Sequence, residues 1–243
     1  MSELESIRNF KRVVLKLSGE ALRAPGSHDN ISPEIVGRIA KEIHEARESS
    51  GVELAIVVGG GNFWRGASAS ARGMDRATAD YVGMLATVMN ALALQAALEQ
   101  EGEECIVHSA IHMQNVAEPF IRRKASRQMS RGAIVIFAAG TGSPFFSTDT
   151  TAALRANEMN ADVIFKATMV DGVYDSDPKK NPEARRFETV SFRECISKEL
   201  GVMDTTAFSL CMDNDIPIIV FDLGREGNIQ IALNHGEIGT IVH

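Results

Sequence analysis

Short apolar runs alternate along the chain with longer segments that mix apolar and polar residues, and this alternation predicts the fold class. The run Leu54–Val58 is uninterrupted and ends directly at glycine, which is typical of a parallel strand covered on both faces. Ser32-Pro33-Glu34 begins one of the longer segments with an N-cap, a first-turn proline and an acid near the positive end of a helix. The alternation predicts an α/β fold, a three-layer αβα sandwich with a mostly parallel central sheet and right-handed crossovers.

The boundaries of the predicted elements follow from these runs and from the turn residues between them. The expected strands are Val13–Leu17, Leu54–Val58, Glu104–Val107, Ala133–Ala138, Asp162–Lys166, Pro217–Phe221 and Gly239–Val242. The expected helices are Pro33–Ser50, Asp75–Gln100, Ala117–Ser130, Thr148–Asn160, Ser191–Leu200, Asp204–Asn214 and Glu226–Leu233. Thr168–Arg186 is polar and turn-rich, and Asp171-Gly172 predicts a hairpin turn there. No repeat, low-complexity tract or linker divides the chain, so residues 1–243 are predicted to form a single domain.

The segment Tyr81–Leu98 contains no charged residue, and as a helix it would be ~27 Å long, close to the length that crosses a membrane. It also contains glycine, threonine, asparagine, glutamine and several alanines, and Asp80 and Glu99 flank it. These polar and small residues favour a helix buried in protein rather than in lipid. Because the helix is apolar on more than one face, we expect core on one side, a subunit interface on the other, and therefore a homo-oligomer.

Composition and charge exclude several classes of protein. Lys and Arg number 25 against 32 Asp and Glu, a net charge of −7, and this argues against a generally cationic nucleic-acid-binding protein. The 3 cysteines are far apart and odd in number, which argues against a disulfide framework or a zinc site and fits a reducing cytoplasm. The opening residues, MSELESIRNF, lack the apolar core of a secretory signal, so none is expected.

The usual signatures of phosphate and dinucleotide chemistry are missing from the sequence. There is no Walker motif, and the catalytic motifs of protein kinases are absent as well. Two glycine-rich turns begin like a dinucleotide fingerprint, but Trp64 and Phe145 occupy the position of the third glycine. A partial calcium-loop pattern likewise fails, because Lys180 replaces its invariant glycine.

Three predicted strands end in turns that suit an anion: Lys16-Leu17-Ser18-Gly19, Gly59-Gly60-Gly61-Asn62 and Gly140-Thr141-Gly142. In a parallel sheet these turns lie at the same carboxyl edge, where glycine lets the backbone approach a ligand closely. Each turn alone is explained equally well as a tight strand-to-helix connection with Ser, Thr or Asp as an N-cap. The three together, with Lys16, Arg65 and Lys166 beside them, favour a polyphosphate site.

Lys16 and Lys166 each lie at the end of an apolar strand, where an unpaired ammonium group is costly. A snorkelling or salt-bridged lysine is one explanation, and a phosphate partner explains both positions at once. Asp149 and Asp204 are candidate counter-charges, able to orient a lysine or to hold Mg²⁺ through water. For Asp204, a plain helix N-cap explains the spacing equally well.

Several motifs, in the same order along nearly the whole chain, resemble the bacterial uridylate (UMP) kinases within the amino acid kinase superfamily. The Met-Leu-Ala-Thr-Val-Met-Asn helix and the Pro-Phe-Phe loop are the motifs most specific to that family. The matching segments are Lys16-Leu17-Ser18-Gly19-Glu20-Ala21-Leu22, Gly59-Gly60-Gly61-Asn62 with Arg65-Gly66, Gly83-Met84-Leu85-Ala86-Thr87-Val88-Met89-Asn90, Gly140-Thr141-Gly142 with Pro144-Phe145-Phe146, and Lys166-Ala167-Thr168 with Val170-Asp171-Gly172-Val173-Tyr174.

The resemblance implies an amino acid kinase-like αβα fold and transfer of the ATP γ-phosphoryl group to UMP, giving UDP and ADP. It also implies a cytoplasmic homohexamer in pyrimidine nucleotide biosynthesis, with Mg²⁺ carried on the ATP phosphates and no direct protein ligand assigned. The matching catalytic positions are Lys16, Arg65, Asp149, Lys166 and Asp204. Those that would bind ATP are Lys16, Leu17, Ser18, Gly19, Gly61, Arg65, Thr168, Tyr174 and Asp177. Those that would bind UMP are Gly60, Asp80, Thr141, Gly142, Ser143, Pro144, Phe145, Phe146, Ser147 and Thr148.

The residue types are consistent with this chemistry, because a phosphate acceptor is already an oxyanion and needs no general base. The resemblance implies an allosteric enzyme. The sequence departs from the family pattern in the loop Arg23–Asn30 and in Ala91–Gln100, which lacks the basic residues of GTP-activated members, so activation by GTP stays open. Two alternatives stay open. One is another kinase of the superfamily acting on a carboxylate or carbamate, and the other is a non-catalytic nucleotide-binding protein.

Overall fold

The structure is a computed structural model that describes residue 7 and residues 10–178, 180–235 and 237–243, so most of the segment tested for a secretory signal lies outside it. The strands are β1 (Arg12–Leu17), β2 (Glu53–Val58), β3 (Cys105–Ser109), β4 (Glu118–Pro119), β5 (Ile134–Ala138), β6 (Val163–Thr168), β7 (Thr189–Val190), β8 (Ile218–Asp222) and β9 (Thr240–Val242). The helices are the 3₁₀ turn η1 (Gly19–Leu22) and α2 (Pro33–Ser50), α3 (Gly66–Ser70), α4 (Arg76–Gln100), α5 (Arg122–Met129), α6 (Thr148–Met159), α7 (Phe192–Ser197), α8 (Thr205–Met212) and α9 (Asn228–Leu233).

The described strands form one nine-stranded sheet in the order β4-β3-β5-β2-β1-β6-β8-β9-β7. Neighbours from β4 to β8 run parallel, and β9 pairs antiparallel with β8. The mostly parallel sheet is therefore confirmed. Because β1, β2, β5 and β6 are adjacent and parallel, the loops that follow them meet at one edge of the sheet.

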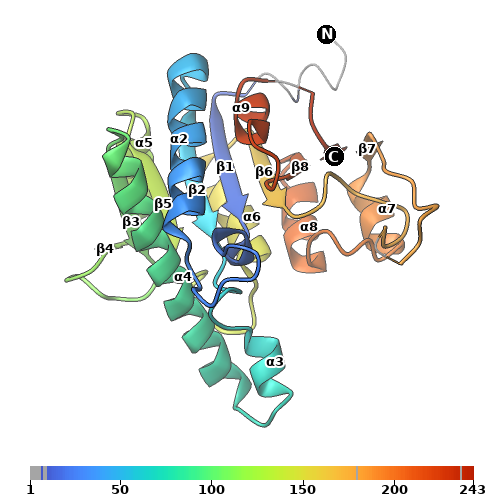
Figure 1. The fold of residues 1–243 in the computed structure, drawn as a ribbon, viewed down its shortest axis with the longest axis horizontal. Helices are drawn as coiled ribbons and strands as arrows, with labels where there is room; N and C mark the ends of the chain where they lie inside the picture. The colour runs from blue at the N-terminus through green and yellow to red at the C-terminus, as the bar shows by residue number, and fades with distance from the viewer. Residues whose placement is uncertain (1–6, 8–9, 179, 236) are drawn as a thin grey trace.

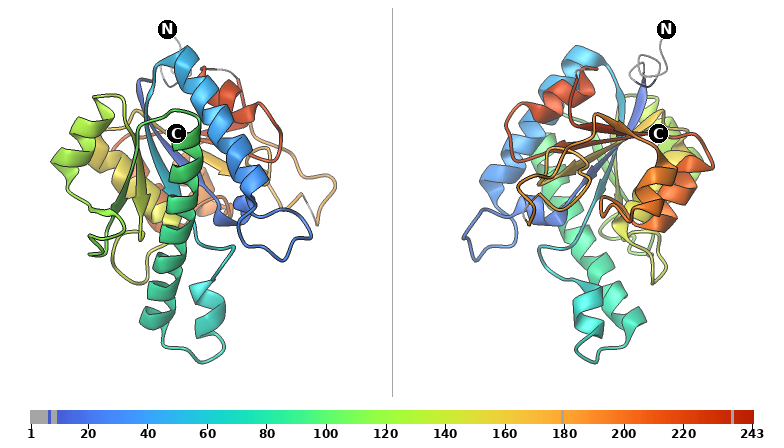
Figure 2. Two further views of the ribbon diagram at one scale, coloured as in Figure 1. Left: turned by 60° about the vertical axis from the view of Figure 1, so that its left-hand side comes forward. Right: turned by 90° about the vertical axis from the view of Figure 1, so that its right-hand side faces the viewer.

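Helices cover both faces of the sheet, which makes three layers (Figures 1 and 2). Buried residues of α2, α4 and α9 pack on one face, and buried residues of α5, α6 and α8 pack on the other. The predicted αβα sandwich is confirmed.

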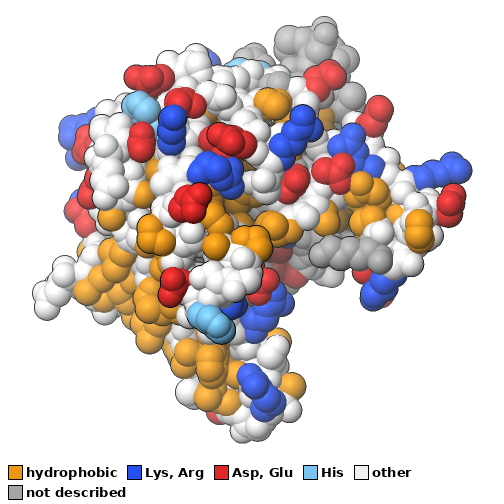
Figure 3. All heavy atoms as spheres, in the orientation of Figure 1, with side chains coloured by type: hydrophobic (Ala, Val, Ile, Leu, Met, Phe, Trp, Pro, Cys, Tyr) orange, Lys and Arg blue, Asp and Glu red, His pale blue; other side chains and the backbone are white. Residues whose placement is uncertain are grey.

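The long helix α4 extends beyond the strand ends, with α3 beside it (Figure 2). By length and composition α4 is the one helix in the described residues that could cross a membrane. However, Ala91, Leu94 and Leu98 of this helix are fully buried against the sheet and α2. Hydrophobic side chains are also exposed on the surface where α4 runs (Figure 3). The helix is therefore core on one side, as expected, and exposes apolar residues on another.

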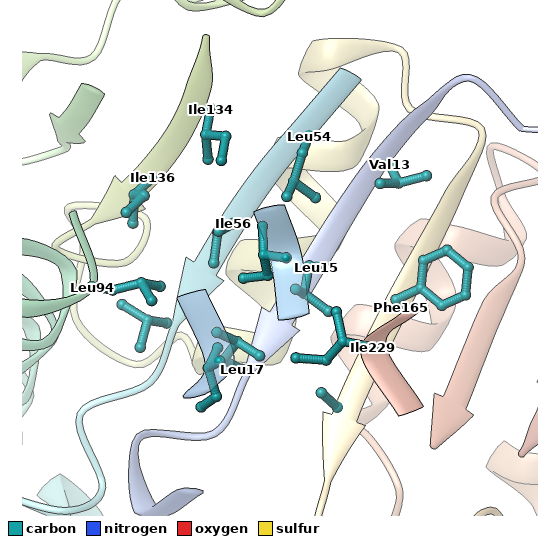
Figure 4. Packing of buried hydrophobic residues seen from close by; sticks show 14 of the residues in the cluster. Val13, Leu15, Leu17, Leu54, Ile56, Leu94, Ile134, Ile136, Phe165 and Ile229 are labelled. Carbon is teal, nitrogen blue, oxygen red and sulfur yellow. The ribbon is translucent and has the colours of Figure 1, made fainter. Parts of the chain in front are cut away.

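The apolar side chains of the central strands alternate between the two faces of the sheet. Leu15 and Ile56 point to the side of α2, α4 and α9, where Figure 4 shows them with Leu94 and Ile229. Their sequence neighbours, such as Val14, pack on the opposite side. Each uninterrupted apolar strand thus contributes side chains to the core on both faces of the sheet, as a parallel sheet between two helix layers requires.

Local signals explain where the helices that carry the site begin. The Ser32 hydroxyl accepts the Ile35 amide at 3.4 Å at the start of α2, and the Asp75 carboxylate accepts the Thr78 amide at 2.8 Å at the start of α4. Ser147 accepts the amides of Asp149 and Thr150 at 3.0 and 3.1 Å at the start of α6. These polar N-caps fix the first turns of helices whose amides face the carboxyl edge.

Two sequence-based predictions are wrong in detail. The helix expected from Ala117 begins only at Arg122, because Glu118 and Pro119 form the short edge strand β4 beside β3. A residue before proline disfavours helical backbone, which explains the later start. Asp171-Gly172 does not close a tight hairpin: the antiparallel pair lies further on, between Tyr174 and Arg186.

Candidate active site

The glycine-rich turns after β1 and β2 contact each other at the carboxyl edge of the sheet. A Cβ added to Gly19 would lie 2.4 Å from the Gly59 carbonyl oxygen, and one added to Gly60 would lie 2.8 Å from the Gly83 carbonyl oxygen. Both distances are shorter than a Cβ tolerates, so these positions admit only glycine without a backbone shift.

A buried pair of asparagines holds the second turn in place. The side-chain amides of Asn62 and Asn90 donate to each other's oxygens at 2.9 and 2.8 Å, and Asn90 also donates to the Gly59 carbonyl at 2.6 Å. Asn62 donates further to the Asn30 carbonyl at 2.8 Å. Fully paired buried amides of this kind fix the geometry of a loop. Their pairing spans distant parts of the chain and could not be predicted from spacing.

Three charged side chains form the centre of the site. Lys16 Nζ lies 2.8 Å from Asp149 Oδ1, and Lys166 Nζ lies 2.7 Å from Asp149 Oδ2. The lysines are 8% and 7% exposed, so both ammonium groups are nearly buried. Lys166 also donates to the Val202 carbonyl. The salt-bridged explanation of the two strand-end lysines is therefore correct in this structure, with one carboxylate shared by two cations.

The shared carboxylate alters the protonation of the cluster. Burial raises the pKa of Asp149, but the two ammonium groups outweigh it and hold that pKa below its ordinary value. Burial lowers the pKa of Lys166, an effect that Asp149 opposes and that the charge on Lys16 reinforces. The charge of Asp204 also favours the protonated form of Lys166, so two carboxylates lie near the two cations.

Asp204 has the role of a helix cap and also joins two elements of the site. It accepts the Ala207 amide at 2.8 Å at the start of α8 and the Thr150 hydroxyl of α6 at 2.9 Å. The Ser147 hydroxyl donates to it as well. The N-cap explanation is therefore correct, and the same carboxylate lies at the boundary of the cavities described next.

Two cavities open at this edge of the sheet and share Lys16, Ser18, Arg65 and Asp204. The larger, of about 940 Å³, is also lined by the predicted residues Asp149, Lys166, Thr168, Tyr174 and Asp177. The smaller, of about 660 Å³, is also lined by the predicted residues Gly19, Gly60, Gly61, Asp80, Thr141, Ser143, Phe145, Phe146, Ser147 and Thr148. Most residues predicted for ATP line the larger cavity and most predicted for UMP line the smaller one, but Gly19 and Gly61, predicted for ATP, line the smaller cavity. The two cavities meet at the lysine end of β1.

Three predicted residues do not line either cavity: Leu17, Gly142 and Pro144. The Leu17 side chain is fully buried in the core, and Gly142 turns the loop backbone at φ 82°. Sequence reasoning in turn missed the segment 198–203 of the larger cavity, and Arg76 and Thr87 of the smaller one. An isolated surface arginine or a loop without a motif carries no signal of its own.

Arg65 is paired in this structure with a residue that sequence reasoning did not consider. Its Nε lies 3.0 Å from Glu20 Oε1, and both side chains are largely exposed. An exposed ion pair contributes little free energy, so the guanidinium can exchange Glu20 for another anion at small cost. Arg65 therefore suits a ligand in either cavity.

The arrangement suits a phosphate chain better than a metal cage. Among the residues that the structure describes, no group of three or more His, Cys, Asp or Glu could hold a metal ion. Instead, two buried ammonium groups, an exposed guanidinium and the glycine-rich turns surround the junction of the cavities. Such donors hold anionic oxygens and neutralise charge that moves between two bound groups.

Comparisons with known proteins agree with this geometry. The model of the amino acid kinase family matches residues 11–222. A UMP kinase from Bacillus anthracis is 37% identical with a TM-score of 0.91, and the match covers 96% of each chain. A UMP kinase from Ureaplasma parvum is 37% identical with a TM-score of 0.89, over 96% of this chain and 98% of that one. A uridylate kinase from Archaeoglobus fulgidus is 30% identical with a TM-score of 0.72, over 95% and 99%.

Proposed function

The chain belongs to the amino acid kinase family, and from that premise we propose that it transfers the γ-phosphoryl group of ATP to UMP, giving UDP and ADP. The observation that carries the proposal is the Lys16–Asp149–Lys166 cluster at the meeting point of two cavities. The similarity to UMP kinases over nearly the whole length of both chains supports the choice of acceptor. We treat residues 1–243 as a single catalytic domain.

ATP occupies the larger cavity in this proposal. Its base and ribose lie near Tyr174, Asp177 and Thr168, and its phosphates extend toward Lys16 and Lys166. Ser18, which lines both cavities, offers a hydroxyl donor to the phosphates, and we place the amides of Gly19 and Gly61 beside them on the side of the smaller cavity. Phosphates that reach the two ammonium groups gain charge-assisted hydrogen bonds from donors that Asp149 already holds in place.

UMP occupies the smaller cavity. Its phosphate faces Gly60, the shared Arg65 and the start of α6, where the positive end of the helix dipole favours an anion. Its nucleoside lies along the loop Thr141–Thr148, with Asp80 as an acceptor for a ribose hydroxyl. The two substrates then meet at the residues shared by both cavities.

The chemistry requires positioning and charge neutralisation rather than proton transfer. The acceptor phosphate is already an oxyanion, so in-line attack needs no general base. Lys16, Lys166 and Arg65 surround the place where the transferred group passes and stabilise the charge on its oxygens. Asp149 keeps the two lysines pointed at that place, and Asp204 ties α6 to α8 on its other side.

The donor set fits Mg²⁺ carried on the ATP phosphates. Mg²⁺ in kinases is held mainly by phosphate oxygens and water, with one or two carboxylates. The carboxylate oxygens of Asp149 form salt bridges with the two lysines, and those of Asp204 accept hydrogen bonds from a hydroxyl and an amide. Both carboxylates would therefore contact the ion through its water shell. When bound, the ion neutralises part of the phosphate charge.

We also propose that the protein is a homo-oligomer, with the hexamer of the family resemblance as the expected form. Tyr81, Leu85 and Met89 are spaced four residues apart on α4 and are 45%, 50% and 46% exposed. Their spacing places them in one stripe along the helix. A second copy of the chain would remove this stripe from water. The proposed setting is the cytoplasm, in pyrimidine nucleotide biosynthesis.

The test is an ADP-release assay with ATP, Mg²⁺ and a panel of acceptors: UMP, CMP, aspartate and carbamate. We expect release that depends on UMP and exceeds that with the other acceptors. Release that depends on aspartate or carbamate instead would identify a carboxylate or carbamate kinase. Tight binding of ATP without transfer to any acceptor would identify a nucleotide-binding protein that is not an enzyme.

A further inference from the structure

Arg76 contacts the carboxylate that the proposed function assigns to the acceptor ribose. Its Nε lies 3.0 Å from Asp80 Oδ1 and 2.9 Å from Asp80 Oδ2. The Asp80 side chain is 13% exposed and that of Arg76 is 43% exposed, so the arginine covers the carboxylate from the solvent side. Both residues line the smaller cavity. Neither the catalytic set nor the binding set of this site includes Arg76 so far.

The same carboxylate also holds the loop through which Phe145 lines the cavity. Asp80 Oδ2 accepts the Phe145 amide at 2.8 Å. The Phe145 backbone has φ 72°, a left-handed conformation that costs free energy for a bulky residue and needs support from its surroundings. The guanidinium of Arg76 lies 5.8 Å from the centroid of the Phe145 ring, within the range of a cation–π contact.

Asp80 has little freedom to turn away from this arrangement. A Cβ added to Gly66 would lie 2.4 Å from Asp80 Oδ1, so the first residue of α3 packs directly against the carboxylate. A carboxylate offers about four lone-pair sites, and the amide and the guanidinium leave capacity for another donor. Arg76 thus fixes the direction of those remaining sites without blocking them.

We propose that Arg76 is a positioning residue that sets acceptor specificity: by clamping Asp80 and the ring of Phe145, it directs the carboxylate at a ribose hydroxyl of the acceptor. The inference rests on the proposed function, since it assumes a ribonucleoside monophosphate in the smaller cavity. It predicts that loss of Arg76 lowers kcat/KM for a ribonucleotide acceptor and changes kcat/KM for the matching deoxyribonucleotide little. The KM for ATP, which binds in the other cavity, should not change.

The experiment compares kcat/KM for UMP and dUMP in the wild-type protein and in Arg76→Ala and Arg76→Met. Arg76→Met keeps an apolar stem against Phe145 and removes the guanidinium. We expect the UMP/dUMP ratio to fall about tenfold in both variants, the size of one lost charged hydrogen bond, with KM for ATP unchanged. Arg72→Ala is the matched control, because Arg72 is exposed just before α4, its Nε donates to the Ser68 carbonyl, and it does not line the cavity.

The outcomes separate this inference from the proposed function. Wild-type protein that transfers no phosphoryl group to UMP overturns the proposed function and this inference with it. Wild-type protein that is active on UMP, with a ratio unchanged in both Arg76 variants, overturns the positioning role alone. An equal loss of activity on UMP and dUMP also overturns it, because a merely structural arginine would affect both acceptors alike.

Discussion

Lys16 and Lys166 are register partners on the adjacent parallel strands β1 and β6. Partners in a parallel pair point to the same face, so the sheet itself places two ammonium groups beside each other. Asp149, from the first turn of α6, lies between them and offsets their repulsion. The sheet and α6 together thus hold two ammonium groups in fixed positions where the two cavities meet.

Loss of Lys16 should abolish most of the activity without unfolding the protein. Lys16→Ala removes one preorganised cation from the path of the transferred group, so we expect kcat to fall about 10²- to 10³-fold. The buried Asp149 keeps Lys166 as a partner, which preserves the fold. Steady-state kinetics and a thermal melt check both statements. A folded Lys16→Ala variant with near-native kcat would remove Lys16 from the catalytic set.

The pH dependence of ATP use should report Lys166. Burial lowers the pKa of Lys166 more than Asp149 raises it, so the pKa lies below that of an ordinary lysine. Because the charged form binds the phosphates, kcat/KM for ATP should fall as pH rises through this pKa. Asp149→Asn removes the raising charge, so its alkaline limb should lie at lower pH than that of the wild type, with a reduced kcat. Coincident alkaline limbs for the two proteins would contradict the coupling of Asp149 to Lys166.

A methyl group at Gly66 should disturb the acceptor site selectively. The new Cβ of Gly66→Ala would lie 2.4 Å from Asp80 Oδ1 and must displace the carboxylate. We expect KM for UMP to rise about tenfold, with KM for ATP little changed. Gly37→Ala is the matched control, because Gly37 lies within α2 and a Cβ there meets nothing within 4 Å.

The control variant Gly37→Ala should itself be more stable than the wild type, because alanine replaces glycine inside a helix. Gly37→Ala should keep wild-type kinetics and raise the free energy of unfolding by up to about 1 kcal/mol. If Gly66→Ala binds UMP as well as Gly37→Ala does, the carboxylate of Asp80 does not contribute to acceptor binding.

A charge in the exposed stripe of α4 should weaken assembly. Leu85 is 50% exposed in the middle of that stripe, and Leu85→Asp would bury a carboxylate in the proposed subunit interface. We expect a smaller species than the wild type in light scattering at micromolar concentration. Ile231→Asp, at a site 44% exposed on α9, should assemble like the wild type. A monomeric wild type would contradict the oligomer outright.

Much of this fold is predictable because its strands are nearly pure apolar runs. The expected Val13–Leu17 and Ala133–Ala138 differ from β1 and β5 by one residue each. The two-residue strands β4 and β7 carry no such signal, since pairing across the sheet rather than local propensity creates them. The predicted helix start at Ala117 is wrong for the same reason, and Pro119 is the one sequence signal against it.

The sequence predicts which residues belong to the site, but not which of them form ion pairs with each other. Glycine turns and strand-end lysines indicate a phosphate-binding edge, and the structure brings them together there. Which carboxylate serves which lysine depends on the docking of α6, and spacing along the chain does not encode that distance. Arg76 and Glu20 are missed because each is an ordinary surface charge until the fold supplies its partner.

The most direct measurement follows the γ-phosphoryl group of labelled ATP in the presence of Mg²⁺ and UMP. If the two lysines and the glycine turns hold donor and acceptor phosphates in line, the label appears as the β-phosphate of UDP, and Lys16→Ala abolishes most of that transfer. Label that stays in ATP, or that is released as free phosphate at the same rate with and without UMP, would contradict the account.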